Sequence, residues 1–300
     1  MTINRYLTRG FKRLGFTALI GAGLALQPLH VSAQTPSPAQ QTLAQRATYA
    51  DLVTMAERSE MVVRAEIRKQ ATVSPERAPG LAPGYARLYV EARTLALISG
   101  NARIGEALAY LVDVPLGANG KVPKLKKRQV ILFARTLPDR PVTKRGQEIQ
   151  LVGENAQLEY TPEFEARLRP VLTSLVAADI PPVVSGVADA LAVPGTLAGE
   201  SETQIFLQTA DRSPASITVL RRPGQRPVWG VSWGEIIDSS ARPPAPQTLE
   251  WYRLACFLPA QLPSGANLAR DAAARRLAAS DYAFVIEQLG PCTRAITPAS

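Results

Sequence analysis

The chain has 300 residues and a formal net charge of +9, which comes from 34 lysines and arginines against 25 acidic residues. It contains one histidine, His30, and two cysteines. Histidine titrates near neutral pH and is both the usual general base and the commonest metal ligand, so its scarcity argues against most hydrolases and most transition-metal enzymes.

Residues 1–33 have the layout of a secretory signal peptide. A basic start is followed by an apolar run of 13 residues, Leu14 to Leu26, and by the small-residue motif Val31-Ser32-Ala33. The apolar run is too short to cross a membrane, which takes roughly 20 residues. We therefore expect cleavage near Ala33, loss of His30, and a mature chain in the periplasm of a Gram-negative bacterium or outside the cell, without a transmembrane span.

The mature chain keeps a mild basic surplus. Removal of four basic residues and no acidic ones lowers the formal charge from +9 to about +5, in 267 remaining residues. This charge suits a protein that works near anionic lipid or cell-wall polymer, but it is too diffuse to indicate a nucleic-acid partner. The remaining length favours two modest domains.

The first predicted domain covers residues 47–182 and follows a flexible segment, 34–46, that is rich in Gln, Pro, Ser and Thr. Thr48 and Asp51 predict a capping box at the start of a helix. A second helix opens at residue 161, and Pro181-Pro182 marks the boundary. Alternating apolar residues between the two helices predict strands over 61–67, 87–98, 107–114, 129–134 and 147–160.

Five short strands with a packed helix resemble, in this order, a small OB-type barrel. The resemblance covers residues 47–179 and rests on element order alone, because no diagnostic motif accompanies it. It implies that the strands of the first domain curl into a small barrel.

The second predicted domain, residues 183–300, combines a hairpin sheet with two C-terminal helices linked by a disulfide. A tight reversal is expected at Arg222-Pro223-Gly224-Gln225. The chain as a whole is therefore predicted as an α+β protein of two β-rich domains with packed helices. The strands of the second domain are expected over 183–193, 203–209, 216–222 and 228–238, and its helices over 249–258 and 267–289.

Both cysteines, Cys256 and Cys292, lie in the second domain. An even number of cysteines in an exported protein predicts a disulfide. The spacing is unlike the C-x-x-C of a redox pair, so a structural bridge is expected.

A short motif suggests hydrolase chemistry but lacks its partner. Residues 230–234 read Gly-Val-Ser-Trp-Gly and match the G-x-S-x-G nucleophile elbow of esterases. That serine needs a histidine base, and none remains after export, so the motif is interpreted as a chance match.

Aromatic and acidic residues gather around this motif. Trp229 and Trp233 share one face of a strand with Glu235, and Asp238 follows. Tryptophan faces beside carboxylates would suit a sugar, whereas two large aromatics on one face would also fill a core beneath the helices, together with Trp251. Glu235 and Asp238 are the only catalytic candidates, and two carboxylates three residues apart seldom meet the spacing of a glycosidase.

Two basic groups are further binding candidates. One is the run Lys124, Lys126, Lys127 and Arg128 in a long loop, and the other contains Arg221 and Arg222 at the hairpin tip. Either could hold phosphate of an anionic lipid, or could simply keep a strand edge soluble.

No cofactor or metal is expected, because no phosphate loop or calcium loop is present. The leading hypothesis is an exported, non-enzymatic protein that binds an envelope component, namely a cell-wall glycan, an anionic lipid surface or an envelope protein, through loops. A carboxylate enzyme acting on cell-wall glycan or peptide is one alternative. An envelope assembly protein whose hairpin edge pairs with another chain is the second.

Overall fold

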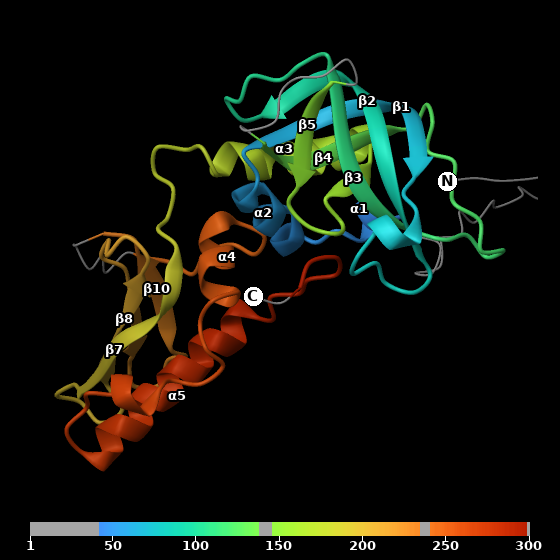
Figure 1. The fold of residues 1–300 in the computed structure, drawn as a ribbon. Helices are drawn as coiled ribbons and strands as arrows, with labels where there is room; N and C mark the ends of the chain where they lie inside the picture. Colours follow the sequence, from blue (N-terminus) through green and yellow to red (C-terminus); the bar gives the residue numbers. More distant parts are fainter. Residues whose placement is uncertain (1–41, 138–145, 235–240, 299–300) are drawn as a thin grey trace, which may run out of the picture. The chain divides into compact units, whose positions relative to one another are not determined.

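Alternating apolar residues form the first sheet, which closes on itself. The computed structural model describes residues 42–137, 146–234 and 241–298. The strand order is β1-β2-β3-β5-β4-β6, and an additional β1–β4 pairing closes a five-stranded barrel (Figure 1). The strands are β1 (Met61–Thr72), β2 (Tyr85–Ser99), β3 (Ala107–Pro115), β4 (Gln129–Thr136), β5 (Gln147–Leu151) and β6 (Gln157–Glu159). Strands β3 and β5 pair in parallel, and the other pairs are antiparallel.

The last predicted strand of the barrel, over 147–160, is two strands in the structure. Both β5 and β6 pair with β4, on either side of Phe133. The Phe133 carbonyl accepts from Val152 N–H and its N–H donates to the Ala156 carbonyl, so residues 153–155 loop out between these two bonds. The turn formers Gly153 and Asn155 explain the interruption.

The interior of the barrel is a separate core, which we call the barrel core. Its members include Val63 and Ile67 of β1, Leu88 of β2, Tyr110 of β3 and Leu132 of β4. The Tyr110 hydroxyl donates to Gln157 Oε1 at 2.7 Å, and burial raises the pKa of this phenol far above its ordinary value. The phenol therefore stays protonated in the barrel at any physiological pH.

A second core, the helical core, lies against the outside of β4. Ile131 and Phe133 belong to it, while their neighbours Val130, Leu132 and Ala134 point into the barrel. Because the side chains on both faces of β4 are buried, the sequence of this strand is a continuous run of apolar residues. The helices that supply the rest of this core are α2 (Tyr49–Arg58), α3 (Pro162–Ser174), α4 (Leu249–Ala255) and α5 (Ala272–Leu289).

The sequence signals for the starts of α2 and α3 are confirmed. Thr48 and Asp51 form the predicted capping box of α2, and the Thr161 side chain caps α3. The flexible segment of residues 34–46 was expected to lack structure, but Leu43–Arg46 form a short helix, α1, with a Thr42 cap. The remainder of that segment and the signal peptide lie outside the described residues.

The second sheet has the order β10-β9-β8-β7, and all its neighbours are antiparallel. Its strands are β7 (Val184–Pro194), β8 (Ser201–Thr209), β9 (Ser216–Arg221) and β10 (Val228–Ser232). Gln225 N–H donates to the Arg222 carbonyl, which confirms the predicted reversal between β9 and β10. Helix α5 packs along β7 and β8 (Figure 1).

Helix α5 begins later than the sequence predicts. The Asp271 side chain accepts from Ala274 N–H and caps α5, which then runs to Leu289. Residues 267–268 are held elsewhere, because Asn267 bridges to Ala190 of β7 and Leu268 N–H donates to the Ala190 carbonyl. A contact with the sheet edge therefore replaces the first turn that the pattern suggested.

The predicted boundary at residue 182 divides residues that share one core. The helical core takes members from both sides of it, such as Phe133 and Val285. The buried guanidinium of Arg253 on α4 pairs with Glu57 of α2 at 2.5 Å, and its Nε donates to the Pro181 carbonyl. The division into two domains stays a prediction.

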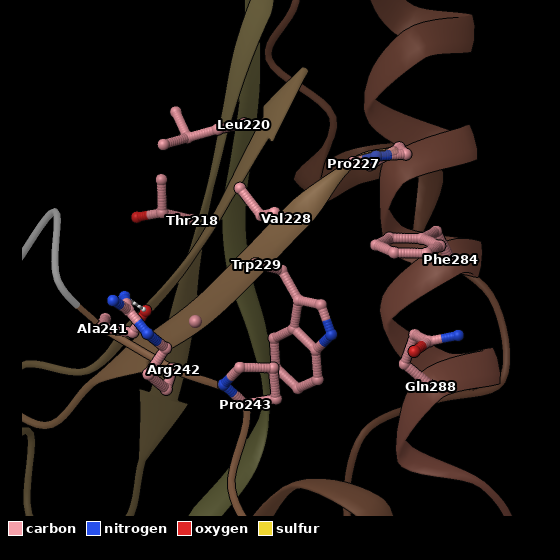
Figure 2. A pocket seen from close by; sticks show the side chains of 11 residues that line it. Thr218, Leu220, Pro227, Val228, Trp229, Ala241, Arg242, Pro243, Phe284 and Gln288 are labelled. Atoms are coloured by element: carbon pink, nitrogen blue, oxygen red, sulfur yellow. Dashed lines mark hydrogen bonds between the residues drawn. The ribbon is translucent and has the colours of Figure 1, made fainter. Parts of the chain in front are cut away.

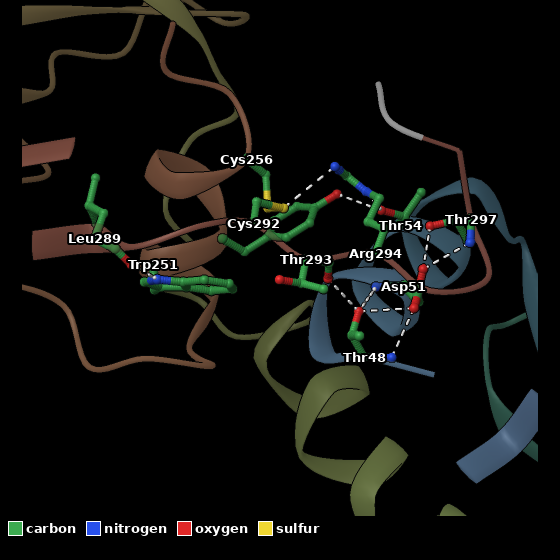
Figure 3. The surroundings of a disulfide bond; sticks show 11 residues. Thr48, Asp51, Thr54, Trp251, Cys256, Leu289, Cys292, Thr293, Arg294 and Thr297 are labelled. Carbon is green, nitrogen blue, oxygen red and sulfur yellow. Dashed lines mark hydrogen bonds between the residues drawn. A yellow bond between two sulfur atoms is a disulfide. The ribbon is translucent and has the colours of Figure 1, made fainter. Parts of the chain in front are cut away.

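The predicted disulfide joins Cys256, at the end of α4, to Cys292, which follows α5. Beyond it, the C-terminal segment crosses to α2 (Figure 3). There the carboxylate of Asp51 accepts from the N–H groups of Ala295 and Thr297. The Trp251 indole N–H donates to the Leu289 carbonyl at 2.8 Å, which fixes α4 against the end of α5. Both ends of the described chain are thus tied together.

Among the helices in residues 42–137, 146–234 and 241–298, none has both the length and the apolar content that a membrane span requires.

Candidate functional site

A groove of about 970 Å³ runs across the outer face of β2, β3 and β5. Along each strand, the residues of the groove floor alternate with residues of the barrel core, because successive residues of a strand point to opposite faces. Leu88 and Val90 of β2 point inward, so Arg87 and Tyr89 face the groove. We call this site the barrel groove and define its floor by Arg87, Tyr89, Leu111, Asp113 and Gln150.

The floor is built from cross-strand pairs of β2 and β3. Arg87 lies opposite Asp113, and Tyr89 lies opposite Leu111. Residues directly opposite one another on the same face of a sheet lie in side-chain contact range. A charged pair and an aromatic-aliphatic pair are thereby placed side by side.

The charged pair is bidentate. Arg87 Nε and Nη2 donate to the two carboxylate oxygens of Asp113, each at 2.7 Å. Arg87 Nη1 also donates to the Pro79 carbonyl at 3.2 Å. Hydrogen bonding to Asp113 raises the pKa of Arg87 above its ordinary value. The guanidinium and the carboxylate are therefore held in a fixed plane at one end of the floor.

Leu111 is the most unusual residue of the floor. It is 51% exposed on the outside of β3, where Ala109 and Asp113 are its outward neighbours and Asp113 is polar. Single exposed leucines are common on protein surfaces, but this one lies beside Tyr89 inside a groove. The pair provides an apolar platform for a ligand.

The walls come from the connection between β1 and β2 and from the region around β5. Thr72, Ser74 and Arg77 line one side, and Leu137, Glu148 and Glu154 line the other. Among the described residues that line the groove, two arginines, Arg77 and Arg87, accompany three acidic residues, Asp113, Glu148 and Glu154. Charges of both signs nearly balance in this described lining, which suits a neutral polar ligand better than a polyanion.

None of the floor residues was predicted from the sequence. The available signal was Leu111, an apolar residue at the outward phase of the alternating segment Leu108 to Val114. Such a residue gains meaning only when Tyr89 is known to lie opposite it, and that register comes from the folded sheet.

The predicted tryptophans lie in the core. Trp229 is a member of the helical core, as is Trp251, and Trp233 packs against that core. This arrangement matches the core-packing alternative for these side chains. Glu235 and Asp238 lie outside the described residues.

The basic run in the loop between β3 and β4 is exposed and is not among the described residues that line the barrel groove. Lys124, Lys126, Lys127 and Arg128 are all solvent-exposed, and Arg128 lies 3.8 Å from Glu159. Neutral groups fix the loop itself, since the Gln70 side chain donates to the Pro123 carbonyl and accepts from Leu125 N–H. Leu125 packs into the end of the barrel core. The basic side chains form a surface patch on a well-anchored loop.

The two arginines of the second basic group, Arg221 and Arg222, have different roles. Arg221 Nε donates to Asp281 Oδ1 at 2.6 Å, and Asp281, a residue of α5, is completely buried. Thr203 Oγ1 donates to the other oxygen of Asp281 at 2.5 Å. Arg222 is exposed at the hairpin tip. Arg221 therefore holds α5 on the sheet, which leaves Arg222 as the exposed member.

This arrangement predicts unequal effects of two substitutions. Asp281→Asn should lower the free energy of unfolding by about 2–3 kcal/mol, because the buried Arg221 contact loses its charge partner. Arg222→Ala, the exposed control, should change it by less than about 0.5 kcal/mol. Urea denaturation monitored by tryptophan fluorescence measures both values, and equal effects would contradict the assignment.

Among the described residues, no group of three histidine, cysteine or acidic side chains is arranged to hold a metal ion. The arrangement of the barrel groove thus offers binding groups, namely an aromatic ring, an aliphatic side chain, an amide and a planar ion pair. A comparison of the chain with protein-family models and with curated proteins gives no match.

Proposed function

We propose that the protein is exported to the periplasm and binds a neutral glycan strand of the cell wall in the barrel groove, without altering it chemically. The observation that carries this proposal is the floor of the groove, where Tyr89 and Leu111 lie beside the Arg87–Asp113 pair. Sugar rings have one apolar face and equatorial hydroxyls, so they pack on aromatic rings and bond to planar polar groups.

The barrel architecture supports this choice of ligand. In OB-type barrels the outer face of the second and third strands and the adjoining loops bind oligosaccharides or oligonucleotides. The barrel groove lies over β2 and β3, and the β1–β2 connection forms one wall. The nearly balanced charge of the described lining residues favours the oligosaccharide over the polyanionic oligonucleotide.

Binding of a neutral tetrasaccharide of N-acetylglucosamine tests the proposal. Tyr89→Ala and Leu111→Ala should each raise the Kd at least about tenfold, equivalent to about 1.4 kcal/mol, because each removes half of the apolar platform. Isothermal titration calorimetry measures the Kd, and thermal unfolding verifies that each variant is folded.

Phe206→Ala is the matched control, since Phe206 is a 40% exposed aromatic residue on β8, away from the barrel. The control should bind like the unmodified protein. If the two groove variants retain full affinity, or if the protein fails to bind the tetrasaccharide at millimolar concentration, the groove is not a glycan site.

The same preparation distinguishes the two other functions that the sequence suggested. Release of new reducing ends from the tetrasaccharide, abolished by Glu235→Gln or Asp238→Asn, would favour the carboxylate enzyme. Salt-sensitive binding to vesicles of anionic lipid, lost when Lys124, Lys126 and Lys127 are neutralised, would favour the lipid surface. The proposed function predicts neither result.

A further inference from the structure

A second pocket, of about 500 Å³, opens along strand β10 at the edge of the second sheet (Figure 2). We call it the edge pocket. Thr218, Leu220 and Val228 line it on the outward face of the sheet, and Trp229 and Phe284 line it on the face that α5 covers. The pocket therefore follows both sides of one strand edge and is separate from the barrel groove.

The main chain of β10 presents bonding groups to this pocket. Val231 N–H points away from β9, because it donates to the Arg242 carbonyl at 3.4 Å. In an antiparallel pair the direction of these groups alternates, so the N–H and C=O of Trp229, two residues earlier, point to the same free edge. Outside the β9–β10 ladder, no described main-chain group bonds to the N–H or C=O of Trp229.

The neighbouring part of this edge already carries an added segment. Residues 241–242 run so close to β10 that a Cβ at Gly230 would lie 2.3 Å from the Ala241 carbonyl carbon, and only glycine fits there. The next residue, Pro243, has no N–H to continue the pairing. The edge of β10 is thus covered beside Val231 and open beside Trp229.

The side chain of Trp229 shows a second unsatisfied donor at the same place. The residue is 6% exposed, and its indole Nε1 has no hydrogen-bond partner among the described residues. The indole nitrogen points toward Phe284 and Gln288 on α5 (Figure 2). A buried donor without a partner costs roughly 1–3 kcal/mol. Trp251, in contrast, donates to the Leu289 carbonyl.

The lining of the edge pocket restricts the occupant. It is largely apolar, and among the described residues that line it Arg242 is the one charged side chain. A strand added to this edge would place alternate side chains on its two sides, near Val228 and Leu220 on one and near Phe284 on the other.

We propose that the edge pocket binds an extended peptide segment of a partner protein, with alternating apolar side chains. The segment pairs with the open main-chain groups of Trp229 and extends the sheet beyond β10. An acceptor on the peptide receives the indole N–H of Trp229. This mode of recognition takes its affinity from main-chain hydrogen bonds and its specificity from the side-chain pockets.

The test uses a pool of synthetic hexapeptides in which valine, leucine or phenylalanine alternates with threonine. The readout is the indole N–H resonance of Trp229 in the ¹⁵N-labelled protein, identified by its absence in Trp229→Phe. Binding should shift this resonance and slow its exchange with solvent. If no peptide of the pool shifts it at millimolar concentration, the proposal is wrong.

Two versions of the best peptide, N-methylated at alternate residues, test main-chain pairing. Only one version removes the N–H groups that face β10, so it should bind at least tenfold more weakly than the other. Equal affinity of the two versions would overturn the proposed pairing.

A pair of matched variants locates the site. Val228 on β10 is 57% exposed and Val193 on the opposite edge strand, β7, is 53% exposed. Val228→Lys should weaken peptide binding at least tenfold, because lysine on an edge strand opposes the pairing of a further strand, whereas Val193→Lys should have no effect. Equal effects would overturn the assignment to β10. A concentration-dependent dimer that Val228→Lys abolishes would show instead that a second copy of the chain occupies the edge.

Discussion

Asp51→Asn should lower the free energy of unfolding by about 3 kcal/mol, because a completely buried carboxylate loses its charge while main-chain and hydroxyl donors still point at it. These donors are the N–H groups of Thr48, Ala295, Ile296 and Thr297 and the hydroxyls of Thr48 and Thr297. Figure 3 shows Thr48 and Thr297 on either side of the Asp51 carboxylate. In a chain of this size the loss should appear as a fall in Tm of roughly 6–12 °C.

Asp189→Asn is the control for this substitution, since Asp189 is an exposed carboxylate on β7. It should change the free energy of unfolding by less than about 0.5 kcal/mol. Equal stability of the two variants in urea denaturation would contradict the role assigned to Asp51.

The pH dependence of stability provides an independent measurement of the same site. Burial by itself would raise the pKa of Asp51, but hydrogen bonds from Thr297, Thr48 and Ala295 outweigh it and hold the pKa below the ordinary value of 3.8. A depressed carboxyl pKa contributes stability above the ordinary value and loses it as the pH falls through the folded-state value. The difference between the unmodified protein and Asp51→Asn should therefore be constant near neutral pH and narrow below pH 3.8. A difference that is unchanged at pH 3 would contradict this assignment.

Reduction of the disulfide should also lower the free energy of unfolding strongly. For two cysteines 36 residues apart, the chain-entropy model gives a loss of about 3.8 kcal/mol. The bridge fixes the segment after α5 to the end of α4, and this segment supplies the donors to Asp51. Unfolding in urea with and without a reductant measures the loss. The double variant Cys256→Ser, Cys292→Ser should be as unstable as the reduced protein and insensitive to the reductant.

The two effects should not add. Once the disulfide is open, the segment that carries Ala295 and Thr297 loses part of its restraint, so Asp51→Asn should cost at least about 1 kcal/mol less in the reduced protein than in the oxidised one. Additive losses would show that the disulfide and Asp51 stabilise the protein independently.

Part of this fold follows from local patterns. Alternating apolar residues identify the barrel strands, because a half-buried strand repeats every two residues. Thr48 and Asp51 identify the start of α2, because an N-terminal cap satisfies N–H groups within three residues of itself. The even number of cysteines, Cys256 and Cys292, in a chain with export features indicates the bridge. Each of these inferences depends on residues close together in the sequence or on a count.

Other features arise from the pairing of distant segments. The sequence suggests one strand over 147–160, but its division depends on how Phe133 of β4 pairs with both halves. The carboxylate of Asp51 reads as a helix cap alone, and its bonds to residues 295–297 become visible only in the folded chain.

The candidate sites also depend on the pairing of distant segments, so the sequence alone does not reveal them. Tyr89 and Leu111 are ordinary strand residues until the register of β2 and β3 places them opposite one another. Trp229 reads as a sugar platform or a core residue, and only the folded structure shows a buried indole N–H without a partner at an open strand edge.

The amino-acid sequence by itself determined the α+β class, most strand and helix positions and the cysteine pair, because periodicity, caps and residue counts are local properties. Only the tertiary structure decided the closure of the barrel, the shared helical core and the composition of both pockets. Those features depend on strand register and on contacts between residues far apart in the chain, and a one-residue change of register moves every side chain of a strand to its opposite face.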